Sequence, residues 1–246
     1  MQLLDKVALV TGGAKRLGRE IALALAREGC DIVVHYRSSR AEADALAREI
    51  RTLGRQAWCV CGDFSNAYAP EVTMKTAWDL AGWIDILVNN ASLYSHDTLA
   101  AASVERMEEL WRVNALAPIL LARKMHALAC ESRILPAGYC GRVVNVLDRS
   151  IASASAENLP YWLAKKDLEA VTRAAALDLA PRFTVNAVAP GPVLPPEDAA
   201  LAEPAGPVPL AVRSLPADVA DAVLYLCRAV TVTGQILFVD GGQHLL

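Results

Sequence analysis

The sequence predicts a single-domain α/β fold in which a doubly wound parallel sheet of about seven strands carries helices on both faces. Two observations predict this fold. Short apolar segments alternate along the 246 residues with segments of helical periodicity, which is typical of strand–helix–strand units. The apolar segments are nearly continuous in valine, isoleucine, leucine and alanine, as expected for parallel strands buried on both faces. No repeat or linker interrupts the alternation, so residues 1–246 are expected to form one domain.

Each element can be placed in order. The predicted strands are KVALVT (6–11), DIVVHY (31–36), QAWCVCGD (56–63), IDILVNNA (84–91), GRVVNVL (141–147), FTVNAVA (183–189) and QILFVD (235–240). The predicted helices cover 16–29, 41–54, 68–82, 103–129, 156–180 and 216–228. Gly29 and Gly54 are natural C-caps for the first two helices. Pro70 is expected in the first turn of the third helix, and Pro118 is expected to kink the fourth.

Composition narrows the class of protein. Apolar residues make up 54% and charged residues 21% of the chain, which predicts a sizeable core rather than disorder. The net charge of −3 disfavours a nucleic-acid or membrane partner. The N-terminal sequence MQLLDKVALVTGG does not resemble a signal peptide, and no apolar stretch is long enough to span a bilayer. We therefore expect a cytoplasmic protein.

Cysteine and histidine positions point away from disulfide and metal chemistry. The six cysteines, at positions 30, 59, 61, 130, 140 and 227, lie in apolar surroundings, and we interpret them as reduced core cysteines. The four histidines, at positions 35, 96, 126 and 244, are scattered and lack ligand spacing, so no metal site is expected.

A glycine-rich turn joins the first strand to the first helix in VTGGAKRLGRE, residues 10–20. Gly12 and Gly13 permit a tight turn, and Gly18 permits close contact between helix and strand. The N-terminus of the helix then offers unpaired N–H groups and positive potential to a pyrophosphate. This context predicts a dinucleotide cofactor.

Several motifs together resemble the short-chain dehydrogenase/reductase family over essentially the whole length. They are Thr11-Gly12, Asn89-Asn90-Ala91, Asn114, Tyr161-x3-Lys165 and Pro190-Gly191, in family order and spacing. The resemblance implies a Rossmann fold and hydride transfer with a nicotinamide cofactor. It implies a cofactor-binding set of Gly12, Lys15, Arg16, Leu17, Gly18, His35, Tyr36, Arg37, Ser38, Asp63, Phe64, Asn90, Ala91, Ser92, Tyr161, Lys165, Pro190 and Gly191.

Three positions depart from the usual family pattern. Arg16 replaces the middle glycine of the first motif, Ser92 the glycine of NNAG, and Asp148 the serine of the catalytic set. All three together are similar to the pteridine reductases. The C-terminal sequence VTGQILFVDGGQHLL, residues 232–246, also resembles bacterial dihydropterin reductases.

The end of the second strand favours NADPH over NADH. A carboxylate there would bind the adenosine ribose of NAD, but this sequence has HYRSSR, residues 35–40. Arg37, Ser38 and Arg40 can bind a 2′-phosphate through charge-assisted hydrogen bonds, with Lys15 and Arg16 in the neighbouring turn. The alternative is that these cations are solvated loop residues. For Asp63, the alternative to an adenine contact is capping of a helix.

Tyr161, Lys165 and Asn114 form the predicted proton-transfer set. Tyr161 and Lys165 share a helical face, and a nearby ammonium is expected to lower the tyrosine pKa from its unperturbed value of about 10. The resemblance implies that Lys165 also holds the nicotinamide ribose and that Asn114 supports it through a water chain. The alternative is an ordinary helix with a solvated lysine.

Asp148 is the residue that separates two kinds of reduction. A carboxylate would repel the alkoxide that develops when a ketone is reduced. A ring C=N instead gains a basic nitrogen that needs a proton, which a carboxylic acid, or a carboxylate relaying protons to Tyr161, can supply. The alternative is an aspartate that merely caps a turn.

The remaining predicted substrate contacts surround a flat pterin. Tyr94 is the candidate for stacking on its face, while Arg16, Ser92, Asp148 and Tyr161 can contact its polar atoms. For Tyr94 the alternative is a loop aromatic packed on a lid. That lid is predicted at 190–215, because 190–210 contains seven prolines after a strand's C-terminal end; the alternative is a rigid surface loop.

The sequence therefore predicts an NADPH-dependent pteridine reductase that reduces dihydrobiopterin, dihydromonapterin or dihydrofolate to the tetrahydropterin. One alternative is a carbonyl reductase, for example of 3-oxoacyl thioesters, and another is an NADPH-binding regulatory or scaffold protein without turnover. Family members usually pair the helices predicted at 103–129 and 156–180, so a homotetramer is expected.

Overall fold

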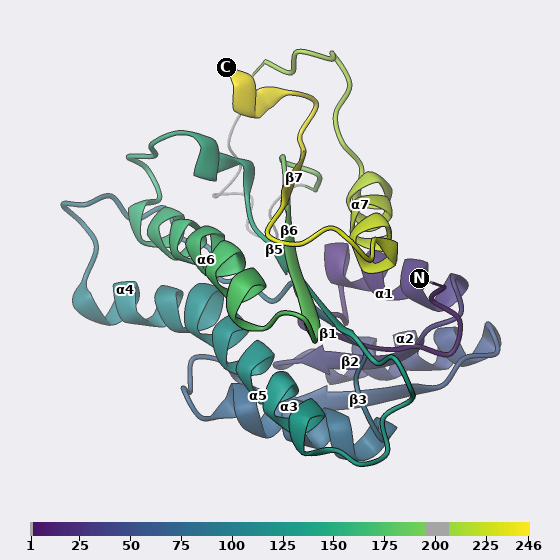
Figure 1. The fold of residues 1–246 in the computed structure, drawn as a ribbon. Coiled ribbons are helices and arrows are strands. Elements are labelled where there is room, and N and C mark those ends of the chain that lie inside the picture. The colour runs from purple at the N-terminus through teal and green to yellow at the C-terminus, as the bar shows by residue number, and fades with distance from the viewer. Residues whose placement is uncertain (1, 195–206) are drawn as a thin grey trace.

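The computed structural model describes residues 2–194 and 207–246 and contains one seven-stranded sheet (Figure 1). All its strand pairs are parallel, in the order β3-β2-β1-β4-β5-β6-β7. The strands are β1 (Val7–Val10), β2 (Asp31–Tyr36), β3 (Ala57–Cys61), β4 (Ile86–Asn89), β5 (Gly141–Val146), β6 (Phe183–Pro190) and β7 (Ile236–Val239). The predicted doubly wound sheet is confirmed.

Helices cover both faces of the sheet (Figure 1). One layer holds α1 (Arg16–Arg27), α2 (Arg40–Thr52) and α7 (Pro216–Arg228). The other layer holds α3 (Ala69–Ala81), α4 (Val104–Trp111), α5 (Ala117–Glu131) and α6 (Leu159–Asp178). The two layers bury separate apolar clusters against the sheet, and residues such as Ile21 and Val223 on one side and Met74 and Leu121 on the other are fully buried.

The predicted helix over 103–129 is interrupted. A π-helical turn, η1 (Arg112–Leu116), separates α4 from α5, and the amide of Ala117 bonds the carbonyl of Arg112 five residues back. Pro118 has no N–H to bond the carbonyl of Asn114, so the regular pattern cannot continue through this point. The kink predicted at Pro118 therefore takes the form of a wider turn centred on Asn114.

The helix predicted to begin at residue 156 begins instead at Leu159, with Asn158 as its N-cap. Pro160 occupies the first turn, where its missing N–H costs nothing because that amide would have no partner within the helix. The four preceding residues, 155–158, include Ser155 and Asn158, residue types that favour turns and caps over a helix interior.

Strand order reverses between β1 and β4, so the loops after these two strands diverge at the carboxyl edge of the sheet. In such sheets, ligands bind in the crevice that this divergence creates. The segment after β5 and the first turn of α6 reach the same edge, because all the strands run in one direction.

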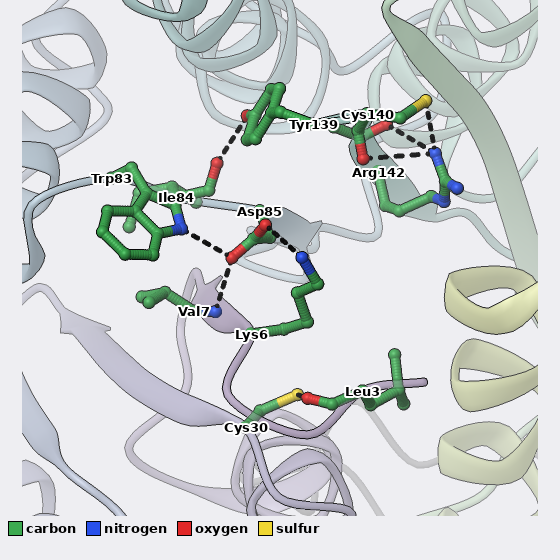
Figure 2. A network of polar contacts seen from close by, with 11 residues as sticks. Leu3, Lys6, Val7, Cys30, Trp83, Ile84, Asp85, Tyr139, Cys140 and Arg142 are labelled. Carbon is green, nitrogen blue, oxygen red and sulfur yellow. Dashed lines mark hydrogen bonds and ion pairs between the residues drawn. The ribbon is translucent and has the colours of Figure 1, made fainter. Parts of the chain in front are cut away.

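The opposite edge of the sheet is held by a buried carboxylate (Figure 2). Asp85, only 1% exposed, accepts hydrogen bonds from the backbone N of Val7 at 2.9 Å, from Nε1 of Trp83 at 2.9 Å and from Nζ of Lys6 at 3.1 Å. A buried charge is tolerated when it is paired and hydrogen-bonded in this way. Asp85 thus fixes the starts of β1 and β4 relative to each other.

A second buried group stabilises the start of β5 (Figure 2). The guanidinium of Arg142 donates to the carbonyls of Cys140 and Gly141, both at 3.2 Å, and to Sγ of Cys140 at 2.7 Å. Nearby, the hydroxyl of Tyr139 donates to the carbonyl of Ile84 at 2.6 Å. These contacts lie at the end of the sheet remote from the ligand crevice, where they serve stability.

The interpretation of all six cysteines as core residues is wrong. Cys30 and Cys227 are buried, and burial raises the pKa of both thiols, that of Cys227 to about 12. Cys61 and Cys130 are exposed, because one follows the alternation of an edge strand and the other lies at the solvent side of α5. Among the described residues, no helix is long and apolar enough to cross a membrane.

Candidate active site

The turn after β1 adopts the conformation that its glycines permit. Gly12 has φ +59°, and Arg16 has φ +54°. A side chain at position 18 would place its Cβ 2.3 Å from the carbonyl oxygen of Gly12 and 2.5 Å from Nδ2 of Asn90, so only glycine fits there. Arg16 occupies the left-handed region at the position where a glycine is usual in the family it resembles, and it brings a cation to the start of α1.

Thr11 joins this turn to the loop after β4. Its hydroxyl oxygen accepts the backbone amides of Asn90 at 2.9 Å and Ala91 at 3.0 Å. Nδ2 of Asn90 donates in return to the carbonyls of Thr11 at 2.8 Å and Gly12 at 3.2 Å. The two loops that line the crevice are therefore one hydrogen-bonded unit.

His35, near the end of β2, is hydrogen-bonded to the same turn. Its Nδ1 accepts the amide of Gly12 at 3.0 Å, so the proton of the neutral ring lies on Nε2, which donates to the carbonyl of Gly62 at 3.0 Å. Burial lowers the pKa of His35 to about 4. The ring also stacks on Phe64, with centroids 4.3 Å apart.

These elements enclose a cavity of about 410 Å³ along the carboxyl edge of the sheet. It is lined by Gly12, Ala14, Lys15, Arg16, Leu17, Gly18, His35, Tyr36, Arg37, Ser38, Ser39, Gly62, Asp63, Phe64, Asn90, Ala91, Ser92, Leu93 and Val113. The structure thus brings together all the predicted cofactor residues between positions 12 and 92. Ala14, Ser39, Gly62, Leu93 and Val113 also line the cavity and were missed. Four of them have no polar side chain, and Ser39 gave no signal that distinguished it from its neighbour Ser38.

The alternative interpretation of Asp63 as a helix cap is wrong, because the next helix, α3, begins at Ala69 and has Tyr68 as its N-cap. Asp63 instead caps a turn. Its Oδ1 accepts the backbone amide of Ser65 at 3.0 Å, and this hydrogen bond holds the pKa of the carboxyl below its usual range. Asp63 nevertheless lines the cavity. Capping and a place in the cavity wall are therefore compatible here.

Asp148 and Tyr161 are hydrogen-bonded to each other, and neither belongs to the cavity lining given above. The hydroxyl of Tyr161 donates to Oδ2 of Asp148 at 3.1 Å, while Oδ1 of Asp148 accepts the amide of Ser150 at 2.8 Å. The second contact caps the 3-10 helix η2 (Arg149–Ala152). Asp148 therefore both caps a turn and faces the predicted proton donor.

The expectation that Lys165 lowers the pKa of Tyr161 is wrong for this state of the protein. Burial raises the pKa of the Tyr161 phenol well above 10, and the carboxylate of Asp148 raises it further. The side chain of Ser92 acts in the opposite direction on the pKa of Tyr161, but its effect is smaller. The phenol is thus held in its protonated form, as a proton donor requires.

Lys165 is itself buried and lies one helical turn from Tyr161. Its Nζ donates to the carbonyl of Val146 at 2.8 Å and lies 5.6 Å from the centre of the Tyr161 ring. Burial lowers the pKa of Lys165 to about 8, and the charge of Asp148 opposes that shift. The lysine is therefore close enough to the tyrosine for both to contact one ligand. Its own hydrogen bond is to the backbone of β5.

The side chain of Asn114, which lies in η1, forms hydrogen bonds to the loop after β4 and to α4. Its Nδ2 donates to the carbonyls of Leu93 at 2.7 Å and Leu110 at 3.0 Å. Its Oδ1 accepts from Oγ of Ser92 at 2.7 Å and from the amide of Leu93 at 3.1 Å. Asn114 thus fixes the loop after β4, and this contact was not part of the sequence prediction.

Comparison with known proteins places this geometry in a family. A family model described as enoyl-(acyl carrier protein) reductase matches residues 12–244. The chain belongs to the short-chain dehydrogenase/reductase family. It is an oxidoreductase of that family.

Relatives of this short-chain dehydrogenase/reductase span its whole length. An uncharacterised oxidoreductase of Mycobacterium tuberculosis is 36% identical, covering 98% of this chain and 93% of that protein. A 3-oxoacyl-[acyl-carrier-protein] reductase of Synechocystis is 33% identical, covering 98% of both. The crystal structure of FolM alternative dihydrofolate reductase 1 from Brucella canis, complexed with NADP, has a TM-score of 0.89 and 34% identity, covering 100% of this chain and 97% of that one.

Within this short-chain dehydrogenase/reductase, Tyr94 lies against Tyr161. The rings of Tyr94 and Tyr161 are edge to face, with centroids 4.8 Å apart and planes at 72°. The predicted stacking residue is therefore next to the predicted proton donor. Residues 195–206, the centre of the predicted lid, lie outside the described residues.

Four residues of the predicted cofactor set are not in the cavity wall, namely Tyr161, Lys165, Pro190 and Gly191. Pro190 ends β6, and Gly191 packs against the C-terminal turn, where an added Cβ would lie 3.1 Å from Cα of Asp240. Trp162 was expected to pack at the helix surface or at a subunit contact, and its Nε1 donates to the carbonyls of Ser150 at 3.0 Å and Ser153 at 2.7 Å. Trp162 thereby holds the segment after Asp148 against α6. Its position directly after Tyr161 was the only signal of this contact in the sequence.

Proposed function

We propose that this enzyme is an NADPH-dependent pteridine reductase that reduces a dihydropterin to the tetrahydropterin by hydride transfer to a ring C=N. The observation that carries the proposal is the carboxylate of Asp148, 3.1 Å from the hydroxyl of Tyr161. Ser92 and Arg16 support it, because both line the cavity and depart from the usual family pattern in the same direction.

The described residues fit a phosphorylated dinucleotide. The turn containing Gly12 and Gly18 excludes a side chain where a pyrophosphate would approach the start of α1. At the far end of the cavity, Arg37 and Ser38 can bind a 2′-phosphate, and no acidic residue follows β2 directly. When bound, NADPH supplies the hydride.

The protein's own groups then provide the proton. Reduction of C=N leaves a basic nitrogen, and the protonated phenol of Tyr161 is positioned to donate to it. Asp148 is hydrogen-bonded to that phenol, so its carboxyl group can return a proton taken up from solvent. The same carboxylate would oppose an alkoxide, which disfavours a ketone as substrate.

Tyr94 is proposed to stack on the pterin and to hold it against the nicotinamide. Its ring is 4.8 Å from that of Tyr161, which is a suitable separation for both to contact one bicyclic ligand. The FolM structure from Brucella canis, bound to NADP, supports an enzyme of this substrate class.

A second candidate is reduction of a 3-oxoacyl thioester. It is favoured by the 33% identity to the 3-oxoacyl-[acyl-carrier-protein] reductase of Synechocystis. The aspartate at position 148 argues against it, since the position would face the carbonyl oxygen.

The two candidates are separated by NADPH oxidation assays with dihydrobiopterin, dihydrofolate and acetoacetyl thioester. The proposal expects turnover with at least one dihydropterin and none with the thioester. Turnover with the thioester alone would overturn it in favour of the second candidate.

We also propose that the enzyme forms a homotetramer through α4 and α6. An apolar groove of about 310 Å³ between these helices is lined by Met107, Glu108, Trp111, Pro160, Leu163, Ala164 and Asp167. Trp111 is 38% and Leu163 37% exposed, so both contribute apolar surface to this groove. Sedimentation of the wild type and of Leu163→Glu tests this; a monomeric wild type would refute it.

A further inference from the structure

The side chain of Asn158 does not cap the helix that it begins. Asn158 is the N-cap of α6 and is 7% exposed, and asparagine at this position commonly accepts an amide of the first turn through its side-chain oxygen. Here no such bond forms. The first amide of the helix, that of Leu159, is instead bonded by the carbonyl of Asp97 at 3.0 Å.

The amide of Asn158 is directed into the substrate side of the site. Its Nδ2 donates to the hydroxyl oxygen of Tyr94 at 3.1 Å, and its Oδ1 accepts from Oγ of Ser155. The bond from Ser155 fixes which way the amide faces. A buried donor is thereby aimed at the one polar atom of the Tyr94 side chain.

The backbone of the same loop is held independently. Arg106 donates to the carbonyl of Tyr94 at 3.3 Å, and its Nε lies 3.4 Å from Oδ2 of Asp97. The main chain at Tyr94 is therefore anchored to α4. The contact from Asn158 restrains the side chain itself, because holding the hydroxyl oxygen in place opposes rotation about the Cα–Cβ bond of Tyr94.

We propose that Asn158 is a positioning residue that fixes the direction in which the Tyr94 ring extends and so favours flat heteroaromatic substrates. It acts through Tyr94 and touches neither substrate nor cofactor. Because α6 carries both Asn158 and Tyr161, the stacking ring and the proton donor keep a fixed relation, with planes at 72°. The inference rests on the proposed pterin substrate.

A double-mutant cycle with Asn158→Ser and Tyr94→Phe tests the proposal. Serine is also favourable at an N-cap position but is too short to reach the Tyr94 hydroxyl, so the contact is lost without an unfavourable residue at the start of the helix. Phenylalanine retains the ring and removes the hydroxyl. Steady-state kinetics with dihydrobiopterin and NADPH, with thermal unfolding as a check on folding, would be measured for the four proteins.

The expected result is a rise of about fivefold in KM for the dihydropterin in Asn158→Ser, the factor that matches one neutral hydrogen bond, with kcat and the Kd for NADPH unchanged. Adding Asn158→Ser to Tyr94→Phe should then raise KM no further. An equal, additive effect in both backgrounds, or a change in NADPH affinity, would overturn the positioning role.

Failure of the underlying function gives a different result. A wild type that turns over no dihydropterin would remove the proposed reaction and, with it, the substrate that Asn158 is proposed to select. A wild type that turns over dihydropterins, combined with an additive cycle, would leave the function standing and remove only the role of Asn158.

Discussion

The two oxygens of Asp148 have different partners: Oδ2 accepts from the hydroxyl of Tyr161 and Oδ1 from the amide of Ser150. The backbone contact orients the carboxyl group, and the other oxygen is thereby held toward the phenol. A residue that only capped the turn would not need the contact with Tyr161. A residue that only moved protons would not need the contact with Ser150.

Replacement of Asp148 should separate proton supply from cofactor binding. We expect Asp148→Ser to reduce dihydropterin turnover by about a hundredfold, the lower end of general acid–base effects, while the Kd for NADPH stays unchanged. Asp148→Asn is the matched control, because it can keep the bond to Ser150 but carries no acid; it should be equally impaired. Pterin turnover at the wild-type rate in either variant would show that the carboxyl group is incidental.

Tyr161→Phe should abolish turnover and leave NADPH binding intact. The phenol is the protonated group nearest Asp148, so we expect a loss of about a thousandfold in kcat. Tyr139→Phe is the control: its buried hydroxyl donates to Ile84 at the opposite edge, and its loss should cost about 1 kcal/mol of stability without affecting turnover. Cofactor fluorescence titration and single-turnover kinetics measure the two effects. Persistent turnover in Tyr161→Phe would require another proton donor.

Arg37→Ala should weaken NADPH much more than NADH. A charge-assisted contact to the 2′-phosphate is expected to contribute about tenfold or more in affinity, and NADH lacks that phosphate. Arg40 offers a comparison, because it begins α2, pairs with Asp44 at 3.5 Å and is absent from the described cavity lining. Equal losses for both cofactors, or a larger loss in Arg40→Ala, would contradict this assignment.

Acid should destabilise the protein through His35. Its folded pKa is about 4 against 6.5 for the free group, so between these values the unfolded chain binds the proton that the native ring does not. Stability from this group is therefore present above about pH 6.5 and is lost as pH falls toward 4. Urea unfolding should show a loss of about 2 kcal/mol between pH 7 and pH 5. His35→Gln should flatten this dependence; an unchanged slope would assign it to other groups.

The sequence was informative wherever a local pattern has one physical solution. Strand β2 was predicted at its observed bounds, because a short, mainly apolar segment between two helical patterns fits a buried strand. Gly18 was recognised because the close approach to Gly12 tolerates no Cβ. The cofactor cavity followed, since its wall is made of consecutive residues at strand ends.

Contacts between distant residues could not be foreseen. Asn158 and Tyr94 are 64 residues apart, and nothing near either one signals the hydrogen bond between them. The pKa of Tyr161 was misjudged for a related reason. The spacing to Lys165 was visible in the sequence, whereas the burial of the phenol and its contact with Asp148 appear only once the chain is folded.

The hydroxyl of Thr11 has a kinetic consequence, because it bonds Asn90 and Ala91 and so couples the turn under the cofactor to the start of the loop that holds Tyr94. We expect a dinucleotide bound in the cavity to order the turn after β1 and the loop that holds Tyr94 together. This would complete one wall of the substrate pocket. Binding is then sequential, with the dinucleotide first and the reduced product released before it. Product-inhibition patterns should be competitive between NADP and NADPH alone, and Thr11→Val should loosen this compulsory order.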